Sequence, residues 1–148
     1  MEQKQLQHLV NEISLQTFGL AFKHQATFNS RLKTTGGRYL LQTHNLEFNE
    51  KILTYHGLEV FKGIIKHELC HYHLHIAKKG YRHQDQDFKK LLKKVDGLRY
   101  APSLPKTNYL LYECQKCHTK YQRQKQIDLK RYVCGKCHGQ LKLCAKVN

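Results

Sequence analysis

The sequence predicts an α+β domain followed by a small cysteine-rich module. Residues 1–98 alternate between helical and β-strand patterns of apolar residues. Both prolines of the chain fall within residues 99–108, which are typical of a linker. Residues 109–148 carry two closely spaced cysteine pairs. We therefore predict a domain over residues 1–98, a linker over 99–108 and a module over 109–148. A chain of 148 residues could also fold as one domain of ordinary size, which is the alternative.

The first half of the domain is expected to combine one helix with short strands. Apolar residues at helical spacing predict an amphipathic helix over residues 3–17. Three β-forming segments follow, separated by glycine or asparagine, and they read ATFNSRL, GGRYLLQT and NLEFN. The third alternates apolar and polar residues, as in a strand with one buried face. The helix is defined by Leu6, Leu9, Val10 and Ile13.

A longer helix is predicted over residues 57–79, with an apolar stripe on one side and histidines on the other. His67, His71 and His75 are four residues apart, so at about 100° per residue they share a face roughly opposite the stripe. Gly80 ends this helix, and another helix is predicted over about residues 85–95. The stripe consists of Leu58, Phe61, Ile65, Leu69, Tyr72 and Ile76.

His67, Glu68 and His71 form an H-E-x-x-H motif on this helix. Residues four apart stand one helical turn above each other, so both imidazoles can bind one zinc ion at about 2.0 to 2.1 Å. Glu68 lies about 100° around the helix from His67, where its carboxylate can take a proton from zinc-bound water. The alternative is a histidine-rich surface helix, but the apolar stripe and the further histidines favour a catalytic site.

A catalytic zinc needs a third protein ligand and keeps a fourth position for water. His75 is two turns, about 11 Å, from the first histidine of the motif and cannot reach the same ion. Gly80 allows the chain to turn back, which makes His83 the best candidate. Asp85 and Asp87 compete with it, and Asp87 is expected to support the ligands or start the next helix.

Four cysteines predict a second zinc site, which is structural. Their pattern is C-x2-C, a spacer of sixteen residues, and a second C-x2-C. Four thiolates close the coordination shell, so this ion does no chemistry and holds together a module too small to fold unaided. Free cytosolic thiols are the alternative. The ligands are Cys114, Cys117, Cys134 and Cys137, while Cys70 and Cys144 are left outside both sites.

The formal net charge of +15 favours a polyanionic partner, most plausibly DNA or another nucleic acid. Residues 99–148 carry 11 Lys and Arg against Glu113 and Asp128, and tyrosines are interspersed among them. A basic surface that only aids solubility is the alternative. The N-terminus is polar and no apolar run approaches the roughly 18 to 20 residues of a membrane span, so a cytoplasmic protein without membrane contact is expected.

The stretch HELCHYHLHIAKKGYRHQDQDF, followed by four paired cysteines, resembles the bacterial SprT-like family, relatives of the DNA-dependent protease Spartan. The resemblance runs from about Leu6 to Leu143. It implies a compact zincin-like domain, a zinc ion held by His67, His71 and His83, and Glu68 as general base. Spartan has a Gly-His-Gly context at the third histidine, whereas Arg82 precedes it here, so the loop geometry differs.

These patterns together predict a zinc metallopeptidase that acts on proteins or peptides, and the resemblance to the SprT-like family implies that its substrates include proteins bound to DNA. Tyr81 or Tyr100 is expected to stabilise the oxyanion, and the NLEFN strand to pair with an extended substrate. A basic zinc ribbon would recruit the enzyme to nucleic acid. The alternative is a non-catalytic, nucleic-acid-binding zinc protein with a structural or silent H-E-x-x-H site; a third possibility is an adaptor without nucleic-acid contact.

Overall fold

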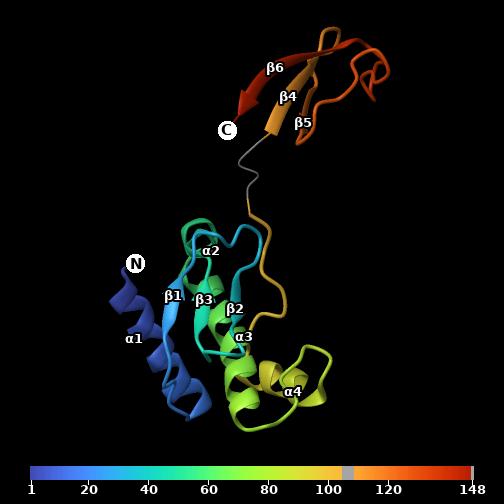
Figure 1. The fold of residues 1–148 in the computed structure, drawn as a ribbon. Coiled ribbons are helices and arrows are strands. Elements are labelled where there is room, and N and C mark those ends of the chain that lie inside the picture. Colours follow the sequence, from blue (N-terminus) through green and yellow to red (C-terminus); the bar gives the residue numbers. More distant parts are fainter. Residues whose placement is uncertain (105–108, 148) are drawn as a thin grey trace. The chain divides into compact units, whose positions relative to one another are not determined.

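The computed structural model describes residues 1–104 and 109–147 of the chain. The chain divides into two compact units, Met1–Leu104 and Pro105–Asn148, and each unit is described by itself (Figure 1). In the first unit the elements are α1 (Gln3–Ile13), η1 (Ser14–Phe18), β1 (Ala26–Phe28), β2 (Gly37–Tyr39), β3 (Leu46–Phe48), α2 (Glu50–His56), α3 (Leu58–Ile76) and α4 (Gln86–Val95). In the second unit they are β4 (Tyr109–Cys114), β5 (Lys120–Arg123) and β6 (Leu141–Val147).

The first unit contains a three-stranded sheet with β3 in the centre. β3 pairs in parallel with β1 and antiparallel with β2. α1 packs beside β1, and α3 packs beside β2. Ala26, Leu46 and Phe48 are fully buried, which places the core between the sheet and these helices. β2 is therefore an edge strand of the sheet that lies next to the helix with the H-E-x-x-H motif.

The apolar stripe of α3 is buried in the core of the first unit along the middle of the helix and exposed at its two ends. Phe61, Ile65 and Leu69 have no exposed surface. Leu58 and Ile76, at the two ends of the predicted stripe, are 43% and 47% exposed. The helix ends at residue 76, three residues before the predicted end. α3 is therefore held by core packing along most of its length, so that the histidines on its other side are fixed in position.

α2 was not predicted from the sequence, which placed residues 50–53 at the end of a β-rich region. Asn49 begins this helix, because its side chain accepts a hydrogen bond from the backbone N–H of Lys51. Ile52 faces the core and is fully buried. Gly57, with φ of 88°, separates α2 from α3 and allows the chain to change direction between them.

The first unit extends beyond residue 98. Leu98, Ala101 and Leu104 are partly buried against its core, so residues 99–104 pack on the domain that they were expected only to follow. Part of the predicted linker, residues 105–108, lies outside the described residues.

The second unit is an antiparallel sheet with β4 between β5 and β6. Its buried core is small and consists mainly of Cys114, Cys134 and Leu141, with Tyr112 only 1% exposed. The predicted fold class, an α+β domain followed by a small module with four clustered cysteines, is confirmed.

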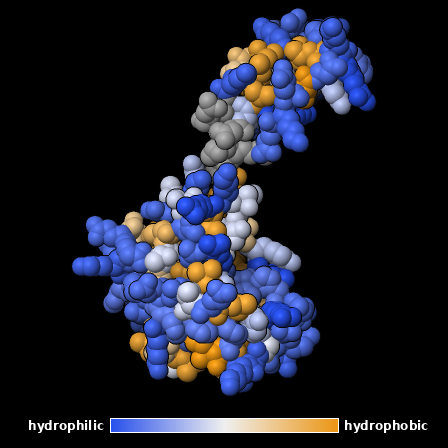
Figure 2. All heavy atoms as spheres, in the orientation of Figure 1, coloured by the Kyte–Doolittle hydropathy of each residue, from blue (hydrophilic) through white to orange (hydrophobic). Residues whose placement is uncertain are grey.

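Hydrophilic side chains cover most of the visible face of each unit, and apolar atoms appear in smaller areas (Figure 2). Among the residues that the structure describes, no helix is both long enough and apolar enough to cross a membrane.

Candidate functional site

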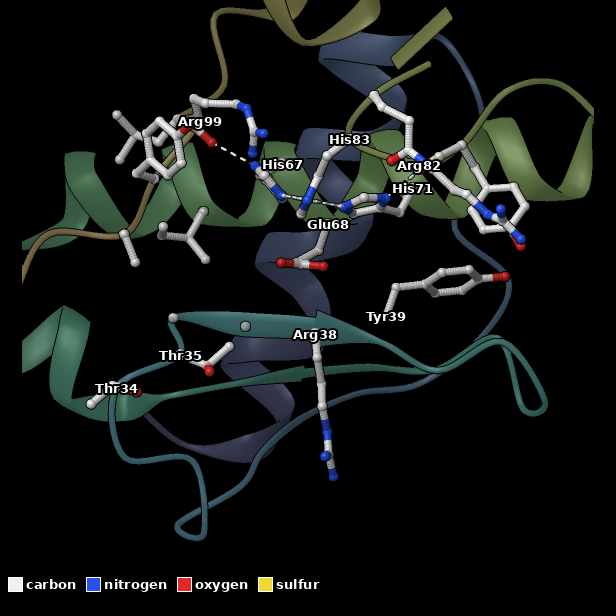
Figure 3. A pocket seen from close by; sticks show the side chains of 18 of the residues that line it. Thr34, Thr35, Arg38, Tyr39, His67, Glu68, His71, Arg82, His83 and Arg99 are labelled. Carbon is white, nitrogen blue, oxygen red and sulfur yellow. Dashed lines mark hydrogen bonds between the residues drawn. The ribbon is translucent and has the colours of Figure 1, made fainter. Parts of the chain in front are cut away.

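Three histidines converge at one point of the first unit. His67 and His71 come from adjacent turns of α3, and His83 comes from the segment between α3 and α4 (Figure 3). Their Nε2 atoms are 3.3 Å apart for His67 and His71, 3.0 Å for His67 and His83, and 2.9 Å for His71 and His83. We call these residues the histidine triad.

Backbone carbonyls orient two members of the triad. The Nδ1 atom of His67 lies 2.7 Å from the Leu98 carbonyl oxygen, and the Nδ1 atom of His71 lies 2.5 Å from the Tyr81 carbonyl oxygen. A carbonyl oxygen only accepts hydrogen bonds, so Nδ1 carries the proton in both neutral rings. Each Nε2 atom therefore presents a lone pair toward the centre of the triad.

The triad fits a divalent cation. Lone pairs that face each other at these distances repel, and a cation between them removes the repulsion. Tetrahedral zinc with Zn–N bonds of about 2.0 to 2.1 Å separates its nitrogen ligands by about 3.3 Å, close to the observed values. Burial lowers the pKa of His67 and that of His71 to about 4, and it also lowers the pKa of His83, so all three rings are neutral near pH 7.

Glu68 is buried directly beside the triad, with 6% of its surface exposed. Its carboxylate lies between the triad and β2 (Figure 3). Burial raises the pKa of Glu68 to about 8, because the charged form is poorly solvated in this position. A carboxyl group with a raised pKa, held beside a cation site, is suited to accepting and returning a proton.

The triad and Glu68 lie on the wall of an open cleft of about 770 Å³. Four stretches of chain surround the cleft: β2 with the residues before it, the middle of α3, residues 81–84 and residues 98–101. An extended polypeptide could therefore reach the triad from solvent.

The four paired cysteines converge in the second unit. Their Sγ atoms all lie within 4.8 Å of one another, with 3.4 Å between Cys114 and Cys137 and 3.6 Å between Cys117 and Cys134. Four thiolates around tetrahedral zinc lie about 3.8 Å apart when each Zn–S bond is about 2.3 Å, so the cluster also fits this ion. His118 and His138 follow the two pairs with φ of 63° and 60°, and neither belongs to the cluster.

Comparison with known proteins identifies the family. Residues 4–110 match the SprT-like family. The chain belongs to the SprT-like family. It is 52% identical to a "Protein SprT-like" of Bacillus cereus strain AH187 and 51% identical to one of Bacillus anthracis strain CDC 684 / NRRL 3495, in both cases over the whole of both chains.

A weaker similarity connects this SprT-like chain to a solved structure, the crystal structure of the metallopeptidase zymogen of Pyrococcus abyssi abylysin. The TM-score is 0.48 and the sequence identity is 19%, over 65% of this chain and 84% of that chain.

Asp85 and Asp87, the alternative candidates for the third ligand, instead stabilise the turn between α3 and α4 of this SprT-like chain. The backbone N–H of Arg82 donates to Asp85 Oδ2 at 3.0 Å, and the N–H of Gly80 donates to Asp87 Oδ2 at 2.9 Å. Gly80 itself is needed here, because a Cβ atom at this position would meet the Asp85 Cβ at 2.8 Å. The two carboxylates thus fix the segment from which His83 reaches the triad.

Two further histidines of α3 serve other contacts. His73 is buried on the core side, and its Nε2 atom lies 2.7 Å from the Oγ of Ser14, whose hydroxyl donates to the Leu20 carbonyl oxygen. His75 contacts the Tyr39 hydroxyl through Nδ1 at 2.6 Å, as expected for a residue too far along the helix to join the triad. Cys70 is fully buried, and burial raises the pKa of its thiol to about 12, so it is an unreactive packing residue.

Leu98 and Gly37 were not identified as site residues from the sequence, and Tyr81 was expected there only for its side chain. Leu98 and Tyr81 act through their carbonyl oxygens, which no side-chain pattern reveals. Leu98 also fills the space above α3 at Gly63, where a Cβ atom would lie 2.6 Å from its Cγ. Gly37 allows β2 to approach the general base candidate, because its Cβ position is 3.2 Å from Glu68 Cγ. The Gly36-Gly37 pair was the available signal, but the sequence indicated only a strand boundary.

Proposed function

We propose that this chain is a zinc-dependent metallopeptidase whose basic ribbon binds nucleic acid. One observation supports the peptidase most strongly: three neutral imidazoles direct their Nε2 atoms to one point, with the buried carboxyl of Glu68 beside them in an open cleft. His67, His71 and His83 would hold the catalytic zinc, and the four paired cysteines a structural zinc.

A zinc ion bound by the triad would lower the pKa of water and polarise the carbonyl of the peptide bond. Glu68 then accepts one proton from the attacking water while the hydroxyl oxygen joins the carbonyl carbon. The C–N bond breaks, and Glu68 returns the proton to the leaving amine. Its buried position keeps bulk water away from the carboxyl, so that proton transfer is directed toward the substrate. Tyr81 and Tyr100, the expected oxyanion donors, both line the cleft.

An extended substrate is proposed to pair with β2. The expectation that NLEFN would offer a free edge was wrong, because these residues contain β3, the central strand. β2 has a free edge and its residues line the cleft above Glu68. Main-chain hydrogen bonds to this edge would align a peptide backbone along the triad, independently of most of its side chains.

The ribbon is proposed to bind DNA through its basic and aromatic side chains. The guanidinium of Arg123 lies 5.6 Å from the centre of the Tyr121 ring, and that of Arg131 lies 5.6 Å from the Tyr132 ring. Tyr132 is 50% exposed and is available for base stacking, whereas Tyr112 is a core residue. Retention on DNA that falls steeply between low and moderate salt supports this contact, and salt-insensitive retention contradicts it.

Replacing the general base tests the peptidase. Glu68→Gln should keep zinc and folding but lower the rate of peptide cleavage by about 10² to 10⁴, since that is the usual contribution of a general base. Glu59→Gln, on the same helix with a side chain that is 90% exposed, is the matched control and should cleave like the wild type. Equal cleavage by both variants contradicts the role of Glu68. A zinc-loaded wild type that cleaves nothing favours the non-catalytic alternative.

Metal content tests the two sites separately. His83→Ala should lose the ion of the triad, and Cys134→Ser should lose that of the ribbon, each without loss of the other. His8→Ala is the matched control for the first variant, because this histidine of α1 is exposed and lies outside the triad. Full metal content in His83→Ala would remove this residue from the proposed ligands.

A further inference from the structure

Two arginines stand at the rim of the cleft with no acidic partner. Arg82 and Arg99 both line the cleft and are exposed. Within residues 1–104, neither guanidinium takes part in an ion pair, whereas Arg38 on β2 pairs with Glu47 on β3. Figure 3 shows the Arg38 side chain pointing away from the triad, on the other side of β2. The free positive charge of the cleft therefore comes from Arg82 and Arg99.

The two arginines lie on opposite sides of the histidine triad. Figure 3 shows Arg99 beyond His67 and Arg82 beyond His71. A second hollow continues the positive surface from Arg99 onto α4, and it is lined by Lys89, Leu92, Lys93, Asp96, Gly97 and Arg99.

The charge of this surface favours an occupant with negative charge. A bound divalent cation would add to the positive field of the two guanidiniums, so an anionic group between them is favoured. Glu68 is the only carboxylate among the lining residues of the cleft, and it is buried at the floor. In the proposed peptidase this occupant is a polypeptide, because the bond to be cleaved has to reach the triad. A polypeptide has a neutral backbone, which can pass Glu68 while its acidic side chains reach the rim.

We infer that the cleft selects peptide segments with acidic side chains on both sides of the bond to be cleaved, with Arg82 and Arg99 as the residues that bind them. This inference rests on the proposed peptidase function and names its substrate class. Because Lys89 and Lys93 extend the positive surface on the Arg99 side, acidic residues on that side contribute more.

Binding to the inactive, zinc-loaded Glu68→Gln chain tests this preference without cleavage. Three fluorescein-labelled peptides of equal length would carry glutamates, glutamines or lysines on both sides of the same central pair. Fluorescence anisotropy at low salt should show the order acidic, neutral, basic, from tightest to weakest. The differences should shrink as salt is added, because exposed charges are screened.

Variants of the two arginines test whether the preference for acidic peptides arises in the cleft. In the same background, Arg82→Gln and Arg99→Gln should each weaken the acidic peptide by about three- to fivefold, the usual size of an exposed ion pair, with the larger effect for Arg99. Binding of the neutral peptide should not change. Arg31→Gln, an exposed arginine outside the cleft lining, removes the same charge and is the control. Arg123→Gln tests whether the ribbon captures the peptide instead.

Several outcomes would overturn the inference: equal binding of the three peptides, an unchanged preference in the double variant Arg82→Gln/Arg99→Gln, or equal losses in Arg31→Gln or Arg123→Gln. An oligonucleotide that loses as much affinity as the acidic peptide in the two cleft variants would assign these arginines to nucleic acid. If the preference holds but the wild type cleaves none of the peptides, the peptidase proposal fails alone. If the wild type cleaves all three equally well and no preference is found, the acidic substrate class fails alone.

Discussion

The histidine triad and the cysteine cluster are two candidate cation sites of opposite design. The triad offers three ligand atoms, lies on the wall of an open cleft and has a buried carboxyl beside it. The cluster offers four sulfur atoms, which fill a tetrahedral shell, and two of its cysteines are core residues of a small unit. A site with a missing ligand and a neighbouring base is suited to chemistry, whereas a complete shell is suited to holding a fold together.

Metal removal should have the largest effect and should affect the two units differently. The second unit has few buried apolar residues, and structural zinc contributes about 10 to 16 kcal/mol to the folding of comparable peptides, so a chelator should unfold it. The first unit has its own extensive core and should keep its helices. Limited proteolysis with a chelator, followed by circular dichroism of the resistant fragment, measures both effects. Loss of both units together, or survival of both, would contradict the assignment of the roles.

A glycine beside the cysteine cluster sharpens the structural side of the comparison. In Gly139→Ala the new Cβ atom would lie 2.7 Å from Cys114 Sγ and 3.2 Å from Cys137 Sγ. We expect loss of the ribbon's ion and of its protease resistance, with peptide cleavage by the first unit retained. Gly135→Ala is the matched control, because its Cβ atom meets only the Tyr121 hydroxyl at 3.8 Å. If the Gly139→Ala ribbon keeps its ion, the cysteine side chains can move apart enough to accommodate the new methyl group.

A glycine beside the triad sharpens the catalytic side. In Gly37→Ala the new Cβ atom would lie 3.0 Å from Phe48 Cδ1 and 3.2 Å from both Glu68 Cγ and the Glu47 carbonyl oxygen. A displacement of about 1 Å lowers the rate of a positioned reaction by about 10²-fold, so, with Glu68 as the proposed general base, we expect a 10- to 100-fold fall in kcat. Metal content should stay unchanged, since no triad atom is touched. Unaltered kcat would mean that Glu68 can move aside without cost.

The smallest effect is expected on the core side of α3, where the buried His73 contacts Ser14 and takes no part in the triad. Ser14→Ala removes the hydrogen-bond partner of the buried His73, which should cost about 1 to 3 kcal/mol of unfolding free energy. Urea unfolding followed by the helical signal of the first unit measures this loss. Thr54→Ala is the control and should change stability much less, because the exposed Thr54 hydroxyl donates only to the Glu50 carbonyl oxygen within α2. A Ser14→Ala protein as stable as the wild type would show that water replaces the hydroxyl.

The convergence of the histidines and of the cysteines was predictable from the sequence in large part, because the spacing of these residues determines which of them lie close together. His67 and His71 are four residues apart on a helix, so their side chains were expected to lie next to each other. The C-x2-C spacing of each cysteine pair is typical of structural zinc sites. Residue 83 could only be ranked above Asp85 and Asp87, since a turn of unknown path separates it from the helix. The structure brings the imidazole of His83 to the other two and ties both carboxylates to backbone N–H groups.

The arrangement of the short strands could not be predicted in the same way. β1, β2 and β3 have three residues each, too few for a pattern to reveal which strand is central. The NLEFN strand looked like a free edge because Leu46 and Phe48 alternate with polar residues, yet it lies between two partners. α2 was missed because its signal, Asn49 as a cap, was read as the end of a strand.

The carbonyl of Leu98 has a consequence for how the protein is made. α3, with two of the three imidazoles, is synthesised before the segments that orient them, which end at Tyr81 and Leu98. On the ribosome, a nascent chain that stops before residue 98 carries the motif but leaves His67 free to rotate. The first unit can therefore complete its histidine triad only late in translation, when almost all of its residues have emerged.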